Sequence, residues 1–240
     1  IIKSNTKDLS SKVKEKMADF GIAFDGDMDR VVFVDEKGEF VNTSNLGALL
    51  AKHLLKNNRR EDEVIIYSSA ASKIIYDTAL RYGGKPIREK VGHAFIKGRM
   101  KETNALFGME HSAHYYYRDN YYADSGLITS LLVLEIYSQA KKHGMKFSDL
   151  LKEFDVYAQA DEVNITLKDN QNILGRIEKH YKAKKPKKID YFDGLTIEFD
   201  DFWFSIRKSN TEPLLRVNLE DRDIKIIKEK LEEVLSLVKK

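Results

Sequence analysis

Short apolar runs alternate with helix-length segments between residues 63 and 144, and this alternation restricts the possible folds more than any other feature. The runs EVIIYSS, KPIREKVG and ALFGM have the length and composition of strands. The segments KIIYDTALRYGG and HAFIKGRMKET, which separate them, have the length of helices. Strands that are connected through such helices form a parallel or mixed sheet with helices packed against it. The sequence therefore predicts a mixed-sheet α/β domain over residues 42–152.

A different pattern follows residue 152. The runs GLTIEF, FWFSIR and LLRVNL succeed one another as strands, and helices are predicted over residues 170–182 and near the C-terminus. This pattern predicts a smaller α+β domain over residues 153–240. Residues 1–41 contain a short helix and the strand GIAF before a hairpin, and Ser44 is the expected N-cap of the helix that comes next.

The composition narrows the classes of function. Of the 240 residues, 42% are hydrophobic, and Lys+Arg 41 against Asp+Glu 38 leaves a net charge of +3, which gives no case for nucleic acid or an acidic membrane surface. The sequence contains no cysteine, which excludes disulfides and thiolate metal sites and indicates a reducing compartment. Its longest apolar stretch, LITSLLVLEIY, is shorter than the roughly 20 residues of a membrane span. We therefore expect a cytoplasmic protein that binds neither nucleic acid nor membrane.

The segment GIAFDGDMDR places three aspartates directly after an apolar strand. Asp25, Asp27 and Asp29 occupy alternate positions, so their side chains point the same way on an extended backbone. Three carboxylates that approach one another have to share a cation or remain partly protonated. Oxygen ligands suit Mg²⁺ or Ca²⁺, and Mg²⁺ leaves coordination positions that phosphate oxygens fill. Arg30, the next residue, adds a bidentate donor for phosphate.

Three other interpretations of this spacing are available. An EF-hand loop that starts at Asp25 places Glu36 correctly, but it requires glycine in place of Arg30 and helices in place of the flanking strands. A phosphatase of the haloacid-dehalogenase type also has an aspartate pair after an apolar strand, with the first aspartate as nucleophile, and this alternative stays open. A plain acidic turn is common for one or two aspartates but accounts poorly for three followed by arginine.

The segment GMEHSAHYYYRDNYYADSG carries a second alternating set of polar side chains. Glu110, Ser112 and His114 lie two residues apart, and a carboxylate can accept hydrogen bonds from two adjacent sugar hydroxyls. A metal site that combines Glu110, His111 and His114 is disfavoured, because two histidines at this spacing on a non-helical backbone place their rings poorly. Taken alone, the segment fits a sugar-binding loop and an aromatic strand with polar neighbours equally well.

The segment FWFSIRKSNTEPLLRVNLE predicts a tight loop between two strands. Guanidinium, hydroxyl, amide and backbone N–H groups would together form a cradle for an anion there. The side chains that supply these groups are Arg207, Ser209, Asn210, Thr211 and Arg216. The alternative is a helix capping box from Ser209 to Glu212, but Pro213 and the strand-like run LLRVNL argue against a helix. A phosphate site is therefore favoured.

Four segments together resemble the α-D-phosphohexomutase family, which includes phosphoglucomutases and phosphomannomutases. DGDMDR resembles the metal loop of this family, GMEHSAH its sugar loop and RKSNTEP the phosphate loop of its last domain. KVGHAFIKGRMKET is similar to the segment that carries an active-site Gly-His pair. The order and spacing of the four segments agree with the family, and the residues around the sugar loop look most like those of phosphomannomutases.

This resemblance implies a reversible shift of a phosphoryl group between O1 and O6 of a hexose, mannose or glucose, through a bisphosphate. A phosphoserine gives its phosphoryl group to the bound sugar phosphate, and the serine then takes the other phosphate back. The resemblance gives a role to the Mg²⁺ ligands Asp25, Asp27 and Asp29, with Arg30 beside them; to Glu110 and Ser112, which would bind sugar hydroxyls; to His93 as a binding or proton-transfer group; and to Arg207, Ser209, Asn210 and Thr211 around the unreactive phosphate. His114 and Arg216 are further substrate-binding candidates from the residue pattern alone.

The sequence also departs from the family pattern. The nucleophilic serine of family members lies in a loop like Thr-Ala-Ser-His-Asn-Pro in the first of four domains, and no segment here resembles that loop. SSAASK has serines but lacks His-Asn-Pro and stands at a different place in the order. Met109 and Ala113 replace glycines of the sugar loop.

The resemblance therefore implies that residues 1–41 are the end of domain two with its metal loop, residues 42–152 domain three and residues 153–240 domain four. We expect such a chain to bind a phosphohexose and a divalent metal without catalysing the mutase reaction alone. The missing N-terminal domains are its expected protein partner, and a non-catalytic phosphosugar-binding module is the alternative.

Overall fold

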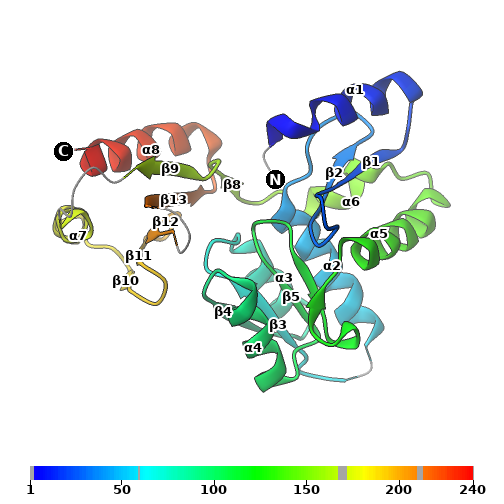
Figure 1. Cartoon of the computed structure of the whole chain (residues 1–240), viewed down its shortest axis with the longest axis horizontal. Helices are drawn as coiled ribbons and strands as arrows, with labels where there is room; N and C mark the ends of the chain where they lie inside the picture. Colours follow the sequence, from blue (N-terminus) through cyan, green and yellow to red (C-terminus); the bar gives the residue numbers. More distant parts are fainter. Residues whose placement is uncertain (1–2, 59, 167–171, 210–212, 240) are drawn as a thin grey trace. The chain divides into compact units, whose positions relative to one another are not determined.

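Residues 3–58, 60–166, 172–209 and 213–239 are described by a computed structural model of the chain (Figure 1). The chain divides into two compact units, Ile1–Asp155 and Val156–Lys240. The first is a mixed-sheet α/β unit and the second a smaller α+β unit, which confirms the predicted fold class. Within the described residues, no helix has both the length and the apolar character that a membrane span requires.

The largest sheet of the first unit has five strands in the order β4-β3-β5-β6-β7. β3 (Val64–Ser68) pairs in parallel with β4 (Lys85–Glu89) and β5 (Phe107–Met109). β6 (Tyr115–Tyr117) and β7 (Ala123–Asp124) extend the sheet as antiparallel strands. Because parallel strands end at one edge of a sheet, the loops that follow β3, β4 and β5 gather at the edge where such folds bind ligands.

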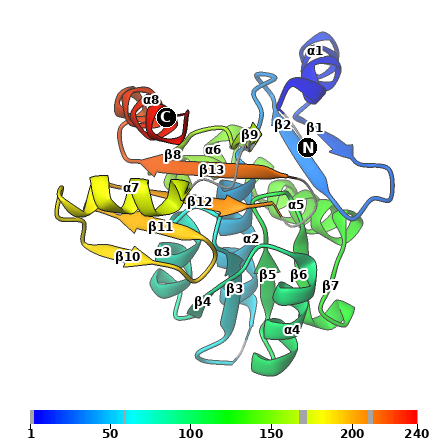
Figure 2. The same ribbon diagram turned by 60° about the vertical axis from the view of Figure 1, so that its left-hand side comes forward.

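Helices cover both faces of this sheet (Figure 2). Met109 points toward Gly47 of α2 (Thr43–Asn57), where a Cβ atom would lie 3.0 Å from the methyl carbon of Met109 and 3.2 Å from Ile75 of α3 (Ile74–Arg81). Its neighbour Gly108 points the other way, toward α4 (His93–Thr103), where a Cβ atom would lie 2.6 Å from the sulfur of Met100. Successive strand residues face opposite sides of a sheet. Met109 therefore packs against the helices on one face, and Gly108 packs against α4 on the other.

The helix that follows the N-terminal hairpin begins two residues earlier than expected. Asn42 is its N-cap, because the side chain of Asn42 accepts hydrogen bonds from the backbone N–H groups of Ser44 and Asn45. The prediction of Ser44 as the cap is therefore wrong. The hydroxyl oxygen of Ser44 instead accepts a hydrogen bond from the backbone N–H of Ser72 at 3.1 Å.

The N-terminal segment forms α1 (Lys7–Lys16) and a two-stranded antiparallel sheet of β1 (Phe20–Phe24) and β2 (Val31–Asp35). A pair of strands is at best marginally stable by itself. Two further helices of the same unit, α5 (Gly126–Lys141) and α6 (Phe147–Leu151), provide the packing surface for this pair. Short 3-10 helices at Lys3–Thr6, Arg118–Asn120 and Lys152–Phe154 complete the described elements of the unit.

Four aromatic rings join the two-stranded sheet to these helices. Phe20 stacks on Phe147 with ring centroids 4.6 Å apart, and the ring of Phe33 lies 6.1 Å from each of them. Tyr137 meets Phe147 edge to face at 5.9 Å. Phe33 and Phe147 are fully buried. This aromatic cluster of Phe20, Phe33, Tyr137 and Phe147 anchors the hairpin that carries the aspartate loop.

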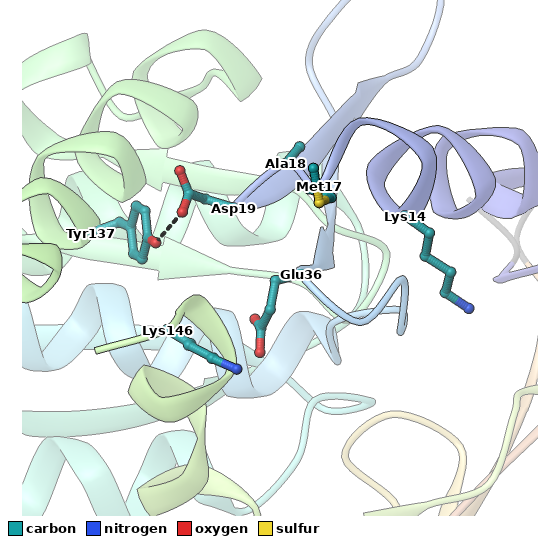
Figure 3. Close-up of a pocket in the computed structure, with 7 residues that line it drawn as sticks. All are labelled: Lys14, Met17, Ala18, Asp19, Glu36, Tyr137 and Lys146. Carbon is teal, nitrogen blue, oxygen red and sulfur yellow. Dashed lines mark hydrogen bonds between the residues drawn. The ribbon is translucent and has the colours of Figure 1, made fainter. Parts of the chain in front are cut away.

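A surface pocket lies beside the aromatic cluster (Figure 3) and is lined by Lys14, Met17, Ala18, Asp19, Glu36, Tyr137 and Lys146. The carboxylate of Asp19 accepts hydrogen bonds from the Nζ of Lys141 at 2.6 Å and from the hydroxyl of Tyr137 at 2.7 Å. The bond from Lys141, with that from Tyr137 second, holds the pKa of Asp19 below its ordinary value.

Lys141→Ala is expected to return the pKa of Asp19 toward its ordinary value. A carboxyl group with a lowered pKa adds stability that is complete above its unfolded pKa of about 3.9 and is lost as the pH falls through the folded pKa. The variant should therefore unfold more easily than wild type at neutral pH, by less than about 1 kcal/mol for so exposed a pair. Urea denaturation should show this deficit disappearing in acid, with Lys142→Ala as the matched control. A deficit that is independent of pH would contradict the assignment.

The second unit contains an antiparallel sheet in the order β10-β11-β12-β13-β8, with β9 also paired to β13. Its elements are β8 (Ala158–Gln159), β9 (Val163–Thr166), α7 (Ile173–Lys182), β10 (Lys188–Asp190), β11 (Leu195–Glu198), β12 (Phe202–Lys208), β13 (Leu214–Asp221) and α8 (Ile224–Lys239). The basic run of residues 182–188 leads from the last residue of α7 to the first residue of β10.

The two faces of this sheet differ in chemistry. Phe204, Ile206 and Val217 face a buried apolar core that also contains residues of α7 and α8. The residues that alternate with them, including Ser205, Arg207, Arg216 and Asn218, lie on the opposite, polar face. The predicted anion-binding residues therefore stand on a sheet face that is not occupied by the apolar core.

Candidate functional site

The aspartate loop connects β1 to β2 in the first unit. Asp25, Asp27 and Asp29 each offer a carboxylate oxygen, and these oxygens lie within 4.8 Å of one another. The Oδ1 atom of Asp29 is buried and accepts no hydrogen bond within the described part of the chain. A buried carboxylate oxygen without a donor is an atom that a cation would satisfy. The three side chains therefore fit a hard divalent cation such as Mg²⁺.

Arg30 closes this loop by binding its first aspartate. The backbone N–H of Arg30 donates to the Oδ1 of Asp25 at 3.1 Å, and its Nε donates to the Oδ2 at 2.5 Å. The same Nε lies 3.7 Å from the Oδ1 of Asp29. Burial acts to raise the pKa of Asp25, but the hydrogen bonds from Arg30 outweigh it and leave the pKa below its ordinary value. Asp25 is therefore held in its charged form.

In Asp29, the effects that raise the pKa outweigh the one that lowers it. Burial raises its pKa, the nearby imidazole of His114 opposes this rise, and repulsion from Asp25 and Asp27 adds to it. The result is a pKa above the ordinary value of an aspartate. A charged Asp29 is therefore costly in this loop without a neutralising partner, which is the condition under which a bound cation contributes most.

The predicted sugar loop connects β5 to β6 and lies beside the aspartate loop. Arg30 and His114 form an antiparallel bridge, and the backbone N–H of Val31 donates to the carbonyl of Ala113 at 3.3 Å. Ala113 has a φ of 70°, in the left-handed region that favours glycine. The Nε2 of His114 lies 3.6 Å from the Oδ2 of Asp29, and its Nδ1 lies 2.9 Å from the hydroxyl of the exposed Ser112.

Glu110 is 3% exposed, and protein donors use both of its carboxylate oxygens. The backbone N–H of Gly92 donates to Oε1 at 2.8 Å, and the hydroxyl of Tyr116 donates to Oε2 at 2.5 Å. Gly92 has a φ of 133° and precedes His93, the exposed first residue of α4. Glu110 therefore fixes the turn that presents His93 as well as lying within the sugar loop.

Asp124, which was not among the predicted site residues, joins this group. Ser125 alone caps α5, because its hydroxyl oxygen accepts a hydrogen bond from the backbone N–H of Ile128. The carboxylate of Asp124 binds the Nζ of Lys97 at 2.9 Å. Ligand atoms of Asp29, His114 and Asp124 also lie within 4.8 Å of one another. The available sequence signal was an acidic residue directly before a serine cap, which one sequence does not distinguish from the cap itself.

The predicted phosphate loop of the second unit joins β12 to β13. Arg207 and Arg216 are direct cross-strand partners, and Arg207 is 6% exposed. The backbone N–H of Ser209 donates to the carbonyl of Leu214 at 2.8 Å, and its hydroxyl oxygen accepts a hydrogen bond from the guanidinium of Arg216 at 3.3 Å. The structure thus brings Arg207, Ser209 and Arg216 together. Asn210 and Thr211, the other two predicted members, lie outside the described residues.

Comparison with known proteins identifies the family of this chain. Residues 42–157 match phosphoglucomutase/phosphomannomutase alpha/beta/alpha domain III, and residues 162–237 match the phosphoglucomutase/phosphomannomutase C-terminal domain. The chain belongs to the α-D-phosphohexomutase family. The predicted resemblance to this family is therefore confirmed.

Individual relatives agree with this membership. A phosphomannomutase of Methanocaldococcus jannaschii is 39% identical over 98% of this phosphohexomutase chain and 50% of its own length. A phosphoglucomutase/phosphomannomutase family protein from Burkholderia thailandensis has a TM-score of 0.85 at 26% identity, over 99% of this chain and 51% of the other. The present chain therefore spans about half the length of the curated relatives it matches.

A more distant structure shows the same fold with ligands bound. N-acetylphosphoglucosamine mutase of Aspergillus fumigatus, solved in complex with GlcNAc-6P and magnesium, has a TM-score of 0.65 at 12% identity. The match covers 90% of this phosphohexomutase chain and 51% of that one. At this identity, the likeness to the fungal enzyme is one of fold.

Proposed function

We propose that this chain carries the metal-, sugar- and phosphate-binding residues of a phosphomannomutase-like phosphohexomutase. Such an enzyme interconverts hexose 6-phosphate and hexose 1-phosphate, mannose or glucose, through a bisphosphate. The observation that carries the proposal is the bridge between Arg30 and His114, which sets the imidazole of His114 3.6 Å from the carboxylate of Asp29. Candidate ligands for a cation and candidate ligands for a sugar thus adjoin in a member of this family.

Asp25, Asp27 and Asp29 would hold Mg²⁺. The grouping of their oxygens supports this assignment, and so does the buried Oδ1 of Asp29, which accepts no hydrogen bond from the residues that the structure describes. The magnesium in the complex of the fungal mutase is consistent with it. When bound, Mg²⁺ supplies positive charge that compensates the oxygens of a transferring phosphoryl group.

The remaining side chains of the first unit would bind and orient the sugar. Arg30 keeps Asp25 charged, and its side chain is 37% exposed, so that its guanidinium would also donate to a phosphate oxygen. Ser112 and His114 offer a hydroxyl and an imidazole to sugar hydroxyls, and Glu110 fixes the loop on which they lie. His93, exposed at the start of α4, would bind the sugar or move a proton.

The second unit would bind the phosphate group that does not react. Arg207 and Arg216 supply charge-assisted donors, and Ser209 supplies a hydroxyl beside them. Binding a sugar through its hydroxyl groups and a remote phosphate suits an enzyme that must accept the ligand in two orientations. Asn210 and Thr211 keep their predicted roles within this proposal.

We further propose that the 240-residue chain binds hexose phosphates without turning them over. A phosphoryl shift through a bisphosphate needs a group that gives and takes back a phosphoryl, and no segment of the sequence resembles the serine loop of the family. Turnover would require a segment that carries such a serine loop. A phosphosugar-binding module without catalysis has the same binding residues.

Calorimetric titration with mannose 6-phosphate and glucose 6-phosphate in the presence of Mg²⁺ tests this function. We expect binding by wild type, and a loss of roughly 10- to 100-fold in affinity for Arg207→Ala, because a charged donor is removed. Arg176→Ala, an exposed arginine of α7, is the matched control and should bind normally.

Two outcomes would contradict these proposals separately. Release of inorganic phosphate that Asp25→Asn abolishes and Arg207→Ala leaves intact would indicate a haloacid-dehalogenase-type phosphatase. Sustained conversion of mannose 1-phosphate by the purified chain would show that the serine loop is dispensable, while leaving the binding assignment in place.

A further inference from the structure

Glu162 lies where an edge of the sheet in the second unit changes register. The chain pairs with β13 both before Glu162, through Gln159–Glu220, and after it, through Val163–Val217. The register of the second pairing is shifted by one residue relative to the first. Asp161 and Glu162 together therefore stand opposite the single residue Asn218. This is the arrangement of a β-bulge, which redirects a side chain and is common beside functional sites.

The bulge brings the carboxylate of Glu162 to the polar face of the sheet. Its Oε1 accepts a hydrogen bond from NH1 of Arg216 at 3.2 Å, and its Oε2 accepts one from Nδ2 of Asn218 at 3.3 Å. The same Oε2 lies 3.7 Å from NH2 of Arg207. The side chain of Glu162 is 22% exposed, so one largely buried carboxylate contacts both arginines of the predicted phosphate site.

The two arginines need such a partner. Like charges directly opposite each other on neighbouring strands repel, and Arg207 and Arg216 are such a pair. A carboxylate between two guanidinium groups reduces this repulsion. The guanidinium of Arg216 is held from two sides, with NH1 on Glu162 and NH2 on the hydroxyl of Ser209. Its plane is therefore fixed by Glu162 and by the first residue of the loop.

We infer that Glu162 is a positioning residue that orients Arg207 and Arg216 for the phosphate of the ligand. It acts through the arginines and does not itself bind the phosphate. The inference rests on the proposed function for the identity of the ligand, and on the geometry of the second unit for the clamp itself. A different consequence would follow if Glu162 only competed with phosphate for the guanidinium groups, because its removal would then strengthen binding.

Titration of the full chain with mannose 6-phosphate and with inorganic phosphate separates these cases. Glu162→Ala should weaken binding of both anions about tenfold, the size expected when one charged hydrogen bond no longer orients its donor. Glu162→Gln should recover part of the affinity, because its amide oxygen still accepts from Arg216. Glu229→Ala, which removes an exposed carboxylate from α8, should bind as wild type does. Equal or tighter binding by Glu162→Ala would overturn the inference.

A measurement without ligand keeps the inference distinguishable from the proposed function. The guanidinium of Arg216, observed by nitrogen-15 NMR and assigned with Arg216→Lys, should rotate slowly in wild type and in Glu162→Gln. It should rotate faster in Glu162→Ala. If wild type binds neither anion but shows this difference, the phosphate-binding function fails and the clamp stands. If rotation is the same in all three proteins, the clamp fails whatever the chain binds.

Discussion

Phe147→Ala is expected to lower the free energy of unfolding of the first unit by about 4 kcal/mol, the usual cost of truncating a fully buried phenylalanine. The ring of Phe147 stacks on Phe20 at 4.6 Å and lies 6.1 Å from Phe33 and 5.9 Å from Tyr137. These neighbours come from β1, β2 and α5, so they cannot all move into the cavity at once. Denaturant unfolding followed by near-ultraviolet circular dichroism measures the loss.

The same variant should weaken Mg²⁺ binding, because the aromatic cluster anchors the two strands that carry the aspartate loop. Phe95→Ala is the matched control, since Phe95 is 47% exposed and its truncation should change the stability by less than about 0.5 kcal/mol. A loss below about 1.5 kcal/mol for Phe147→Ala would mean that the cluster relaxes around the cavity and does not anchor the hairpin.

The order of elements in the α/β part follows from local sequence. Apolar runs such as EVIIYSS and glycine stops such as Gly83, whose φ is 78°, are local signals, and the strand Val64–Ser68 and the helix Ile74–Arg81 lie where these signals indicate. The alternation of Phe204 and Ile206 with Ser205 and Arg207 likewise marks a strand with one apolar face.

Features that depend on contacts between distant residues could not be predicted from local sequence. Asn42 and Ser44 are both good helix caps, and the choice between them depends on the hydrogen bond that Ser72 donates to the hydroxyl of Ser44. Phe147 follows a polar turn and carries no sign that it will meet Phe20 and Phe33. The aromatic cluster therefore appears only in three dimensions.

The candidate site likewise contains features that local sequence predicts and features that depend on distant residues. Alternation within a short loop was enough to predict that the side chains of Asp25, Asp27 and Asp29 group together, and their oxygens do so. The position of Glu162 depends on a register shift between strands, which leaves no mark in a single sequence. Glu110 was predicted to bind sugar hydroxyls. Its oxygens also accept hydrogen bonds from Gly92 and Tyr116, which the sequence did not predict, because a buried carboxylate requires donors from the fold.

Asp29→Asn is expected to reduce the affinity for Mg²⁺ by roughly 100-fold or more, because a full negative charge is lost from direct contact with a dication in a partly buried loop. Asparagine has nearly the same shape and keeps one carbonyl oxygen, so the loop geometry should survive. The stability of the metal-free protein should not fall, since the substitution relieves repulsion among three neighbouring carboxylates.

These opposite effects make the assignment of the aspartate loop testable by thermal unfolding with and without Mg²⁺. A cation that binds only the folded state raises the melting temperature in proportion to its occupancy. Wild type should be stabilised by millimolar Mg²⁺, and Asp29→Asn should show no stabilisation while matching wild type without metal. Asp119→Asn changes a carboxylate that is 95% exposed, and it should respond to Mg²⁺ as wild type does. If Asp29→Asn keeps the full Mg²⁺ response, the three aspartates form an acidic turn and the cation binds elsewhere.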